Sequence, residues 1–182
     1  SYGGPEYETV GSLGSVVGVG DLKAVSKGNE LCNKYGLDTI SVGMAIAFAM
    51  ECYENGILTK ADTGGIDLRF GNADAMLQML ELITKREGLG DLLAEGVKIA
   101  AEKIGKGSEQ YAMHVKGQEL PMHEPRGKNS IGLAYAVSPT GADHMEAPHD
   151  TDFDSPSSPT FQSSGPLGII ETTPSVDLSD QK

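Results

Sequence analysis

Four stretches with helical apolar periodicity, each followed by a glycine, constrain most strongly what this chain can fold into. They run from about Asp21 to Tyr35, Thr39 to Asn55, Ala73 to Glu87 and Asp91 to Ile104. Apolar residues recur in them at spacings of three and four, which is typical of amphipathic α-helices. A glycine just past the last turn supplies a left-handed cap, and positions 36, 56, 88 and 105 are all glycine. The sequence therefore predicts a mainly α, multihelical fold.

The second half of the chain lacks this regularity. We expect a short extended segment at Tyr111–Val115, a loop at Pro121–Gly127 and the start of a helix at Ala142–Glu146. Residues 151–182 are rich in Ser, Pro, Thr, Asp and Gly, interrupted by the apolar Leu167–Ile170. That composition favours a loop or a disordered tail.

The charge balance argues against two classes of partner. The 182 residues carry 14 Lys and Arg against 26 Asp and Glu, a net charge of −12. Such a surface repels phosphate backbones and anionic lipids, so we expect neither nucleic acid nor a membrane surface as a partner. The longest nearly apolar run, Val42–Met50, is shorter than the ~20 residues that span a bilayer. No signal peptide is visible, and this together with the presence of only two cysteines favours the cytoplasm.

Histidines and carboxylates gather near position 144. His144 and His149 lie among Asp143, Glu146 and Asp150. A carboxylate beside an imidazole fixes its tautomer and raises its basicity, as general acid–base catalysis requires. The same residues would suit a divalent metal ion, and a solvated polar loop is the third interpretation.

The N-terminal segment offers a pair of carboxylates. If the segment were extended, we expect one of Glu6 and Glu8 to face a pocket while the other faces water, and an ordinary acidic loop is the other interpretation. The glycines at 11, 14, 18 and 20 resemble a phosphate-binding loop only weakly, and we favour close backbone packing for them. Cys32 and Cys52 lie on apolar helix stripes and are expected to be buried thiols.

Seven blocks of sequence carry a resemblance to a known family. They are Gly4–Thr9, Asn29–Ser41, Ile46–Glu54, Tyr111–Gly117, Glu119–Pro121, Pro125–Gly127 and Gly132–His144. In their order and spacing these blocks resemble the tungsten-containing aldehyde:ferredoxin oxidoreductase family over roughly residues 3–150. The resemblance implies the helical domains 2 and 3 of that family. It divides the chain into a partial cofactor-binding helical domain (1–120), the start of a second helical domain with a catalytic loop (121–150), and the tail (151–182).

The resemblance also implies roles for individual residues. Glu8 and His144 are expected to stand beside the tungsten, bind substrate oxygen and move protons, with Tyr7 lining the same pocket. The family's pterin-binding pattern corresponds to Asn33 through Gly36, Leu37 and Asp38, with Asn33 in place of the family's aspartate. No residue of this chain is expected to bind the metal directly.

The implied function is that of an enzyme. The resemblance indicates a bis-pterin tungsten (or molybdenum) oxidoreductase that oxidises aldehydes to carboxylic acids. Electrons would pass to ferredoxin through a [4Fe–4S] cluster held by cysteines outside this chain, and other subunits or further parts of the same enzyme would complete it. The alternatives are a thioester-reducing relative, an inactive or structural fragment, and a metal-binding module without pterin.

Overall fold

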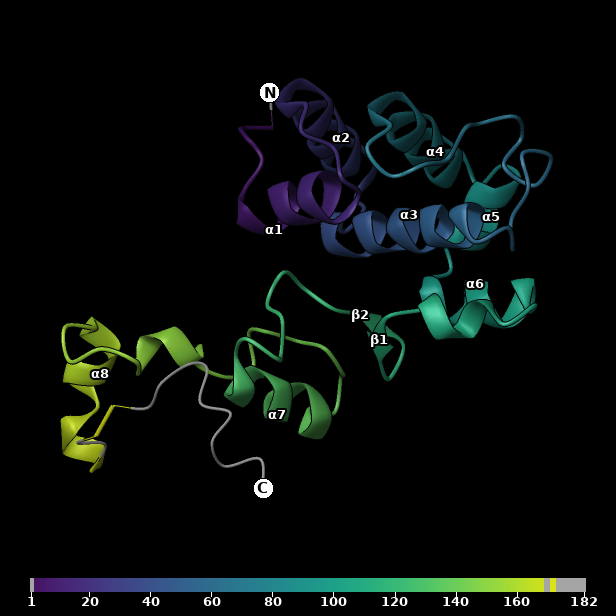
Figure 1. Cartoon of the computed structure of the whole chain (residues 1–182). Helices are drawn as coiled ribbons and strands as arrows, with labels where there is room; N and C mark the ends of the chain where they lie inside the picture. The colour runs from purple at the N-terminus through teal and green to yellow at the C-terminus, as the bar shows by residue number, and fades with distance from the viewer. Residues whose placement is uncertain (1, 169–170, 173–182) are drawn as a thin grey trace. The chain divides into compact units, whose positions relative to one another are not determined.

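The computed structural model describes residues 2–168 and 171–172. The chain forms two compact units, residues 1–122 and 123–182 (Figure 1). The predicted fold class is confirmed, because the described residues are mostly helical and contain one small two-stranded sheet. The predicted division into domains at positions 120 and 150 stays a prediction.

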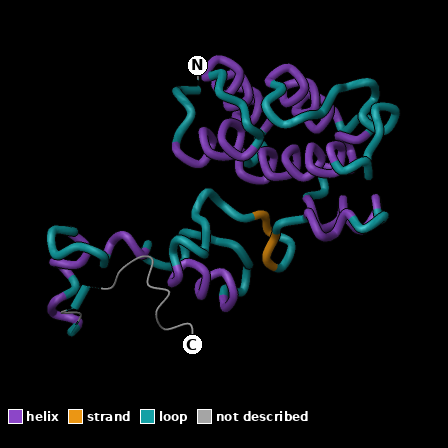
Figure 2. The backbone as a smooth tube through the Cα atoms, in the orientation of Figure 1, coloured by secondary structure: helices purple, strands orange, loops and turns teal. Residues whose placement is uncertain are grey.

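The first unit is a bundle of helices (Figure 2). Its elements are α1 (Tyr7–Val10), the π-helical η1 (Gly11–Val16), α2 (Leu22–Tyr35), α3 (Thr39–Glu54), α4 (Ala73–Lys85), α5 (Leu89–Leu93), α6 (Val97–Ile104) and the 3₁₀ turn η2 (Ser108–Tyr111). Strands β1 (His114–Val115) and β2 (Gln118–Glu119) follow and pair antiparallel, with His114 opposite Glu119.

Helix α3 lies at the centre of the core. It is buried on almost all sides, as its nearly uniform apolar sequence predicts, and it packs against α1, η1, α4 and α6. Its close approach to η1 depends on Gly43, where a Cβ would lie 2.6 Å from Ser12 Cβ. The favoured interpretation of the N-terminal glycines also holds at Gly18, whose backbone has φ +71° and lies against Gly71. Close packing of backbone thus sets the distance between η1, α3 and the loop before α4.

Three of the four predicted helices are confirmed to within two residues at each end, and the fourth is not a single helix. The stretch from Asp91 to Ile104 is broken into α5 and α6 at Gly96, which has φ +84°. The break is stabilised by Glu119, whose carboxylate accepts a hydrogen bond from Val97 N–H at 2.8 Å. A side chain on residue 96 would collide with that carboxylate, so the interruption depends on a partner 22 residues away.

The second unit contains α7 (Asn129–Val137), η3 (Asp150–Asp152), α8 (Pro159–Ser163) and η4 (Gly165–Leu167). The predicted loop before α7 is confirmed, but the predicted helix start at Ala142–Glu146 is wrong. There the Asp143 carboxylate accepts the Met145 N–H at 2.8 Å, which closes a local turn instead of a helix. Within the stretch expected to be a loop or a disordered tail, the described residues form the short helix α8 and the 3₁₀ turn η4, while residues 169–170 and 173–182 lie outside the described residues.

The expected extended segment at Tyr111–Val115 is confirmed in part. Tyr111 ends the turn η2, and only His114 and Val115 form a strand. Within the described residues, no helix combines the length and the apolar character needed to cross a bilayer.

Candidate functional site

Glu6 positions the two predicted catalytic residues that follow it. Its carboxylate accepts the backbone N–H groups of Glu8 and Thr9, both at 3.0 Å, and so caps α1. The alternation expected for an extended segment is therefore wrong. In a helix successive side chains differ by about 100° in direction, so Glu8 is buried while Tyr7 is 64% exposed.

Both predicted catalytic residues bind the backbone of one loop residue, Met122. The Glu8 carboxylate accepts the Met122 N–H at 2.7 Å, and the Tyr7 hydroxyl donates to the Met122 carbonyl at 2.9 Å. Gly11 lies under the same residue, because a Cβ there would overlap the Met122 side chain. The orientation of Glu8 is thus fixed by a residue 114 positions away in the sequence.

The predicted cofactor residues Gly36, Leu37 and Asp38 form the turn between α2 and α3. Gly36 has φ +69°, which confirms the predicted left-handed cap, and Leu37 N–H donates to the Cys32 carbonyl at 2.9 Å. Asp38 caps α3 by accepting the Ser41 N–H at 2.9 Å. A sharp, well-anchored turn therefore presents these three residues.

This turn borders a cleft with a volume of about 200 Å³. Apolar side chains form most of its wall, and Asp38 and Ser41 supply polar groups. The lining residues are Gly36, Leu37, Asp38, Ser41, Val42, Ile83, Leu93, Ala94 and Gly96. The space beside Gly36 is open, since a Cβ there would meet no atom within 4 Å.

Glu119 links the elements on the far side of the cleft by hydrogen bonds and was not among the predicted site residues. Besides Val97 N–H, its carboxylate accepts the Ser41 hydroxyl at 2.9 Å. One buried carboxylate thus joins α3, α6 and β2 around the cleft. Only its presence in the Glu119–Pro121 block gave a signal, because nothing local reveals a partner 78 residues away.

Asn33, the fourth predicted cofactor residue, does not line this cleft. It is exposed on the last turn of α2, and its amide donates to the Asn29 carbonyl at 2.9 Å and to the Asn29 side-chain oxygen at 3.0 Å. Its role toward a cofactor stays a prediction.

Thr39 connects the Glu8 helix to the cleft turn. Its hydroxyl lies 2.9 Å from the Thr9 hydroxyl, and its carbonyl accepts the Ser12 hydroxyl at 2.9 Å. Since Thr39 directly follows Asp38, the first unit holds α1 and the cleft turn in one hydrogen-bonded assembly.

In the second unit, three imidazoles gather around a lysine. The ring centroid of His123 lies 4.8 Å from that of His144 and 4.4 Å from that of His149. Lys128 Nζ lies 3.0 Å from His123 Nδ1 and 3.3 Å from His149 Nδ1. A protonated lysine only donates hydrogen bonds, so a ring nitrogen that binds it is the acceptor.

The environment keeps His123 neutral. Burial, reinforced by the Lys128 charge and the neighbouring imidazoles, lowers the pKa of His123 to about 4. The spacing of residues near His144 indicated a cluster there, but it gave no signal for His123 and Lys128, which lie some 20 residues earlier in the chain.

Asp150 has a structural role in this unit. Its carboxylate accepts the N–H groups of Ser130 at 2.9 Å and Ile131 at 3.1 Å, at the start of α7. Burial alone would raise its pKa, but these hydrogen bonds outweigh burial and hold the pKa below its ordinary value. Asp150 therefore links the start of helix α7 to the residues next to His149 by hydrogen bonds.

Comparison with known proteins identifies the family. The family pattern described as "Aldehyde ferredoxin oxidoreductase, domains 2 & 3" matches residues 2–178. This chain belongs to the aldehyde ferredoxin oxidoreductase family. The tungsten-containing aldehyde ferredoxin oxidoreductase of Pyrococcus horikoshii is 43% identical over 79% of this chain and 24% of its own length. The "aliphatic sulfonate oxidoreductase, WOR-like subunit" of Pyrococcus furiosus is 38% identical over 77% of this chain.

A solved structure is also similar to this chain. The active-site complex BamBC of benzoyl coenzyme A reductase, bound to 1,5-dienoyl-CoA, has a TM-score of 0.59 and 32% identity over 72% of this chain and 20% of its own. The chain spans about a quarter of the length of the curated relatives it matches. The predicted family membership and its class, oxidoreductase, are thereby confirmed.

Proposed function

We propose that this chain is part of a tungsten (or molybdenum) bis-pterin enzyme that oxidises aldehydes to carboxylic acids and passes electrons through a [4Fe–4S] cluster to ferredoxin. The observation that carries the proposal is the family match over residues 2–178. It is supported by relatives whose names specify tungsten, an aldehyde and ferredoxin. The rest of the enzyme, or other subunits, would supply the cysteines of the [4Fe–4S] cluster and the remaining cofactor contacts.

The cleft beside Gly36 suits one edge of a pterin. A pterin is a flat ring with apolar faces and a polar edge, and the cleft offers the apolar Val42, Ile83 and Leu93 together with the Asp38 carboxylate. The open space beside Gly36 lets a ring approach the backbone. We assign Gly36, Leu37 and Asp38 to this contact, with Asn33, on the last turn of α2, as a further candidate. When bound, the metal–pterin group would supply the two-electron sink of the reaction.

The two cysteines do not suit an iron–sulfur cluster. Cys32 and Cys52 are fully buried in the apolar core, as the sequence predicts. Burial raises the pKa of the Cys32 thiol to about 12 and that of Cys52 to about 11, which disfavours the thiolate that a cluster needs. Cluster ligation is therefore assigned to cysteines outside this chain.

Glu8 and His144 are assigned to proton transfer. Conversion of an aldehyde to an acid adds an oxygen from water, so protons must leave as the carbon is oxidised. A buried carboxylate with a fixed orientation can accept such a proton, and an imidazole can transfer it at neutral pH. Tyr7, with its hydroxyl bound to Met122, is assigned to the wall of the same pocket.

One observation favours a second candidate function. The solved structure at 32% identity is named as a benzoyl coenzyme A reductase complex. Reduction of an aromatic thioester is therefore the alternative reaction for this chain. Parallel assays of aldehyde oxidation and aromatic acyl-CoA reduction by the complete enzyme distinguish the two, because only one substrate class should turn over efficiently.

Substitution of Glu8 by Gln in the complete enzyme tests the assignment. Gln keeps an oxygen that can accept the Met122 N–H but cannot take a proton. We expect Glu8→Gln and His144→Asn each to lower kcat for aldehyde oxidation by ~10² or more, the size of a lost general acid–base contribution. The measurement is steady-state turnover with ferredoxin as acceptor, normalised to tungsten content.

Matched controls are available elsewhere in the chain. Glu124→Gln removes an exposed carboxylate that pairs with Arg126, and His114→Asn removes an imidazole that accepts the Gly117 N–H. Both should retain nearly normal kcat. Normal turnover in Glu8→Gln and His144→Asn, with full metal content, would remove these residues from the mechanism.

A further inference from the structure

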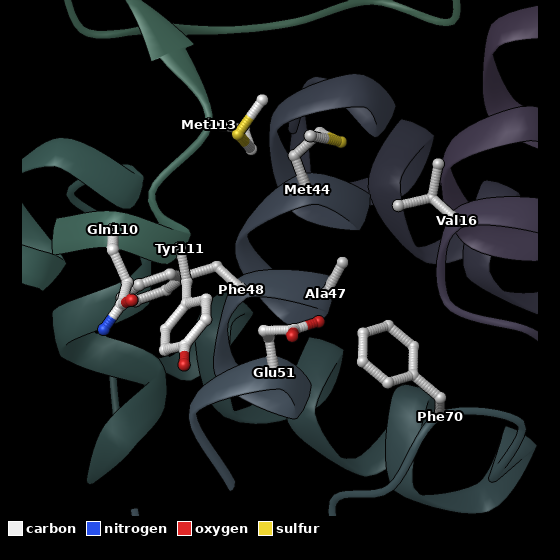
Figure 3. Close-up of a pocket in the computed structure, with 9 residues that line it drawn as sticks. All are labelled: Val16, Met44, Ala47, Phe48, Glu51, Phe70, Gln110, Tyr111 and Met113. Atoms are coloured by element: carbon white, nitrogen blue, oxygen red, sulfur yellow. The ribbon is translucent and has the colours of Figure 1, made fainter. Parts of the chain in front are cut away.

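A second cavity, of about 350 Å³, lies between η1, α3, the loop before α4 and the segment after η2. It shares no lining residue with the cleft beside Gly36. Its volume is at the lower end of the ~300–1,000 Å³ typical of small-molecule sites. Figure 3 shows the side chains that surround it.

The walls of this cavity are aromatic and apolar, and their backbones are anchored. Phe48 is part of α3, and Phe70 is held to that helix because its N–H donates to the Glu54 carboxylate at 3.1 Å. The next residue, Gly71, donates to the Val17 carbonyl at 2.8 Å. Tyr111 ends η2, and Met44 adds a polarisable thioether. The cavity is therefore formed without a ligand.

The polar groups that face this cavity are mainly hydrogen-bond acceptors. In the view of Figure 3 the Glu51 side chain stands between the rings of Tyr111 and Phe70. One Glu51 oxygen accepts the Asn55 amide at 3.3 Å, which leaves the second oxygen for a ligand. The Gln110 amide nitrogen donates to the Gly107 carbonyl at 2.9 Å, so Gln110 offers its oxygen. None of the lining residues in the described part of the chain carries a positive charge.

We propose that this cavity binds a small amphipathic primary amine. Its ammonium group donates to the Glu51 carboxylate, and its aryl or alkyl body packs among Phe48, Phe70 and Met44. The aromatic rings also attract the cation through their π-faces. The net charge of −12 raises the local concentration of cations around the protein. The site is independent of the reaction proposed above.

A pair of isosteric probes tests the proposal in the complete protein. 2-Phenylethylammonium and the neutral 2-phenylethanol have the same aromatic body and differ in the charged head. We expect the amine to bind about tenfold more tightly by calorimetry, the effect of one charge-assisted hydrogen bond. The methyl resonances of Met44 and Met113, which line the cavity, should shift on titration with the amine.

Two substitutions and one control complete the test. Glu51→Gln should abolish the preference for the amine, and Phe70→Leu should weaken amine binding about threefold through loss of a cation–π contact. Glu102→Gln removes an exposed carboxylate on α6 and should leave binding unchanged. Equal affinity for both probes, an unchanged preference in Glu51→Gln, or unshifted Met44 and Met113 methyls would each overturn the proposal.

Discussion

Three carboxylates, those of Glu8, Glu119 and Asp150, are buried in the described part of this acidic chain. Each accepts the backbone N–H of a segment distant in sequence: Met122, Val97, and Ser130 with Ile131. A buried charge is costly unless it is hydrogen-bonded, and these backbone N–H donors offset part of that cost. At the scale of single residues, acidic side chains here thus act as connectors between distant segments.

The contact between Lys128 and His123 predicts how the pKa of His123 changes when the lysine charge is removed. Loss of the Lys128 charge in Lys128→Met should raise the pKa of His123 from about 4 toward its ordinary 6.5, because one of the causes that hold it down is removed. The measurement is the ring resonance of His123 by NMR as a function of pH. Lys103→Met, which alters an exposed residue of α6, is the matched control and should leave that resonance unchanged.

The lowered pKa of His123 also determines whether this residue stabilises or destabilises the folded state as the pH falls. Because the folded pKa lies below 6.5, the unfolded chain binds more protons between pH 6.5 and about 4. His123 therefore makes the folded state lose stability as the pH falls through that window and has no such effect above it. Thermal melts should show a shallower acid decline in Lys128→Met; an identical decline would contradict the role given to Lys128.

At the scale of elements, the contact between η1 and α3 sets the position of the Glu8 helix relative to the cleft turn. Gly43→Ala should destabilise the protein by about 1–3 kcal/mol, the usual cost of overpacking a tight contact. The added Cβ would lie 2.6–2.7 Å from Ser12, including its backbone carbonyl, so relief requires one element to move. Chemical denaturation measures the change in the free energy of unfolding.

Gly20→Ala is the control for this substitution. A Cβ at Gly20 would meet nothing within 4 Å, and the change should stay within about 0.5 kcal/mol. Equal stability of Gly43→Ala and Gly20→Ala would show that the η1–α3 contact is looser than the structure indicates.

Helix boundaries could be predicted where the determinants are local. Asp21, Asp38 and Asn72 each accept a backbone N–H at the start of a helix, and Gly36 ends α2 in the left-handed conformation. The predictions failed at Gly96, at Glu6–Glu8 and at Ala142–Glu146. At Gly96 the stabilising partner, Glu119, is remote; at Glu6 the capping carboxylate was read as part of an extended segment.

At the scale of the whole molecule, the main apolar core belongs to the first unit. Its buried members all lie between Leu13 and Ala101. We therefore expect residues 1–122 to fold alone, with helical circular dichroism and one cooperative thermal transition. This fragment keeps Met122 for Glu8 and Glu119 for Val97.

Truncation after residue 95 provides the comparison. It removes α6, both strands and Glu119, and it leaves the Ser41 side of the cleft without its partner. That fragment should melt broadly and at lower temperature. A non-cooperative transition of residues 1–122 would show that the second unit is needed for the core to form.

Periodicity, caps and glycines along the chain were enough to define the helical class, most helix ends and the family motifs, because these depend on residues within a turn or two of one another. Pairings across 22 to 114 residues, such as Glu8 with Met122 and Ser41 with Glu119, arose only from packing. A hydrogen bond between distant segments has no periodic signature, since it forms only after the core has brought them together. Tertiary structure alone therefore decided that Glu8 is buried, that a cleft opens beside Gly36, and that Lys128 faces two histidines.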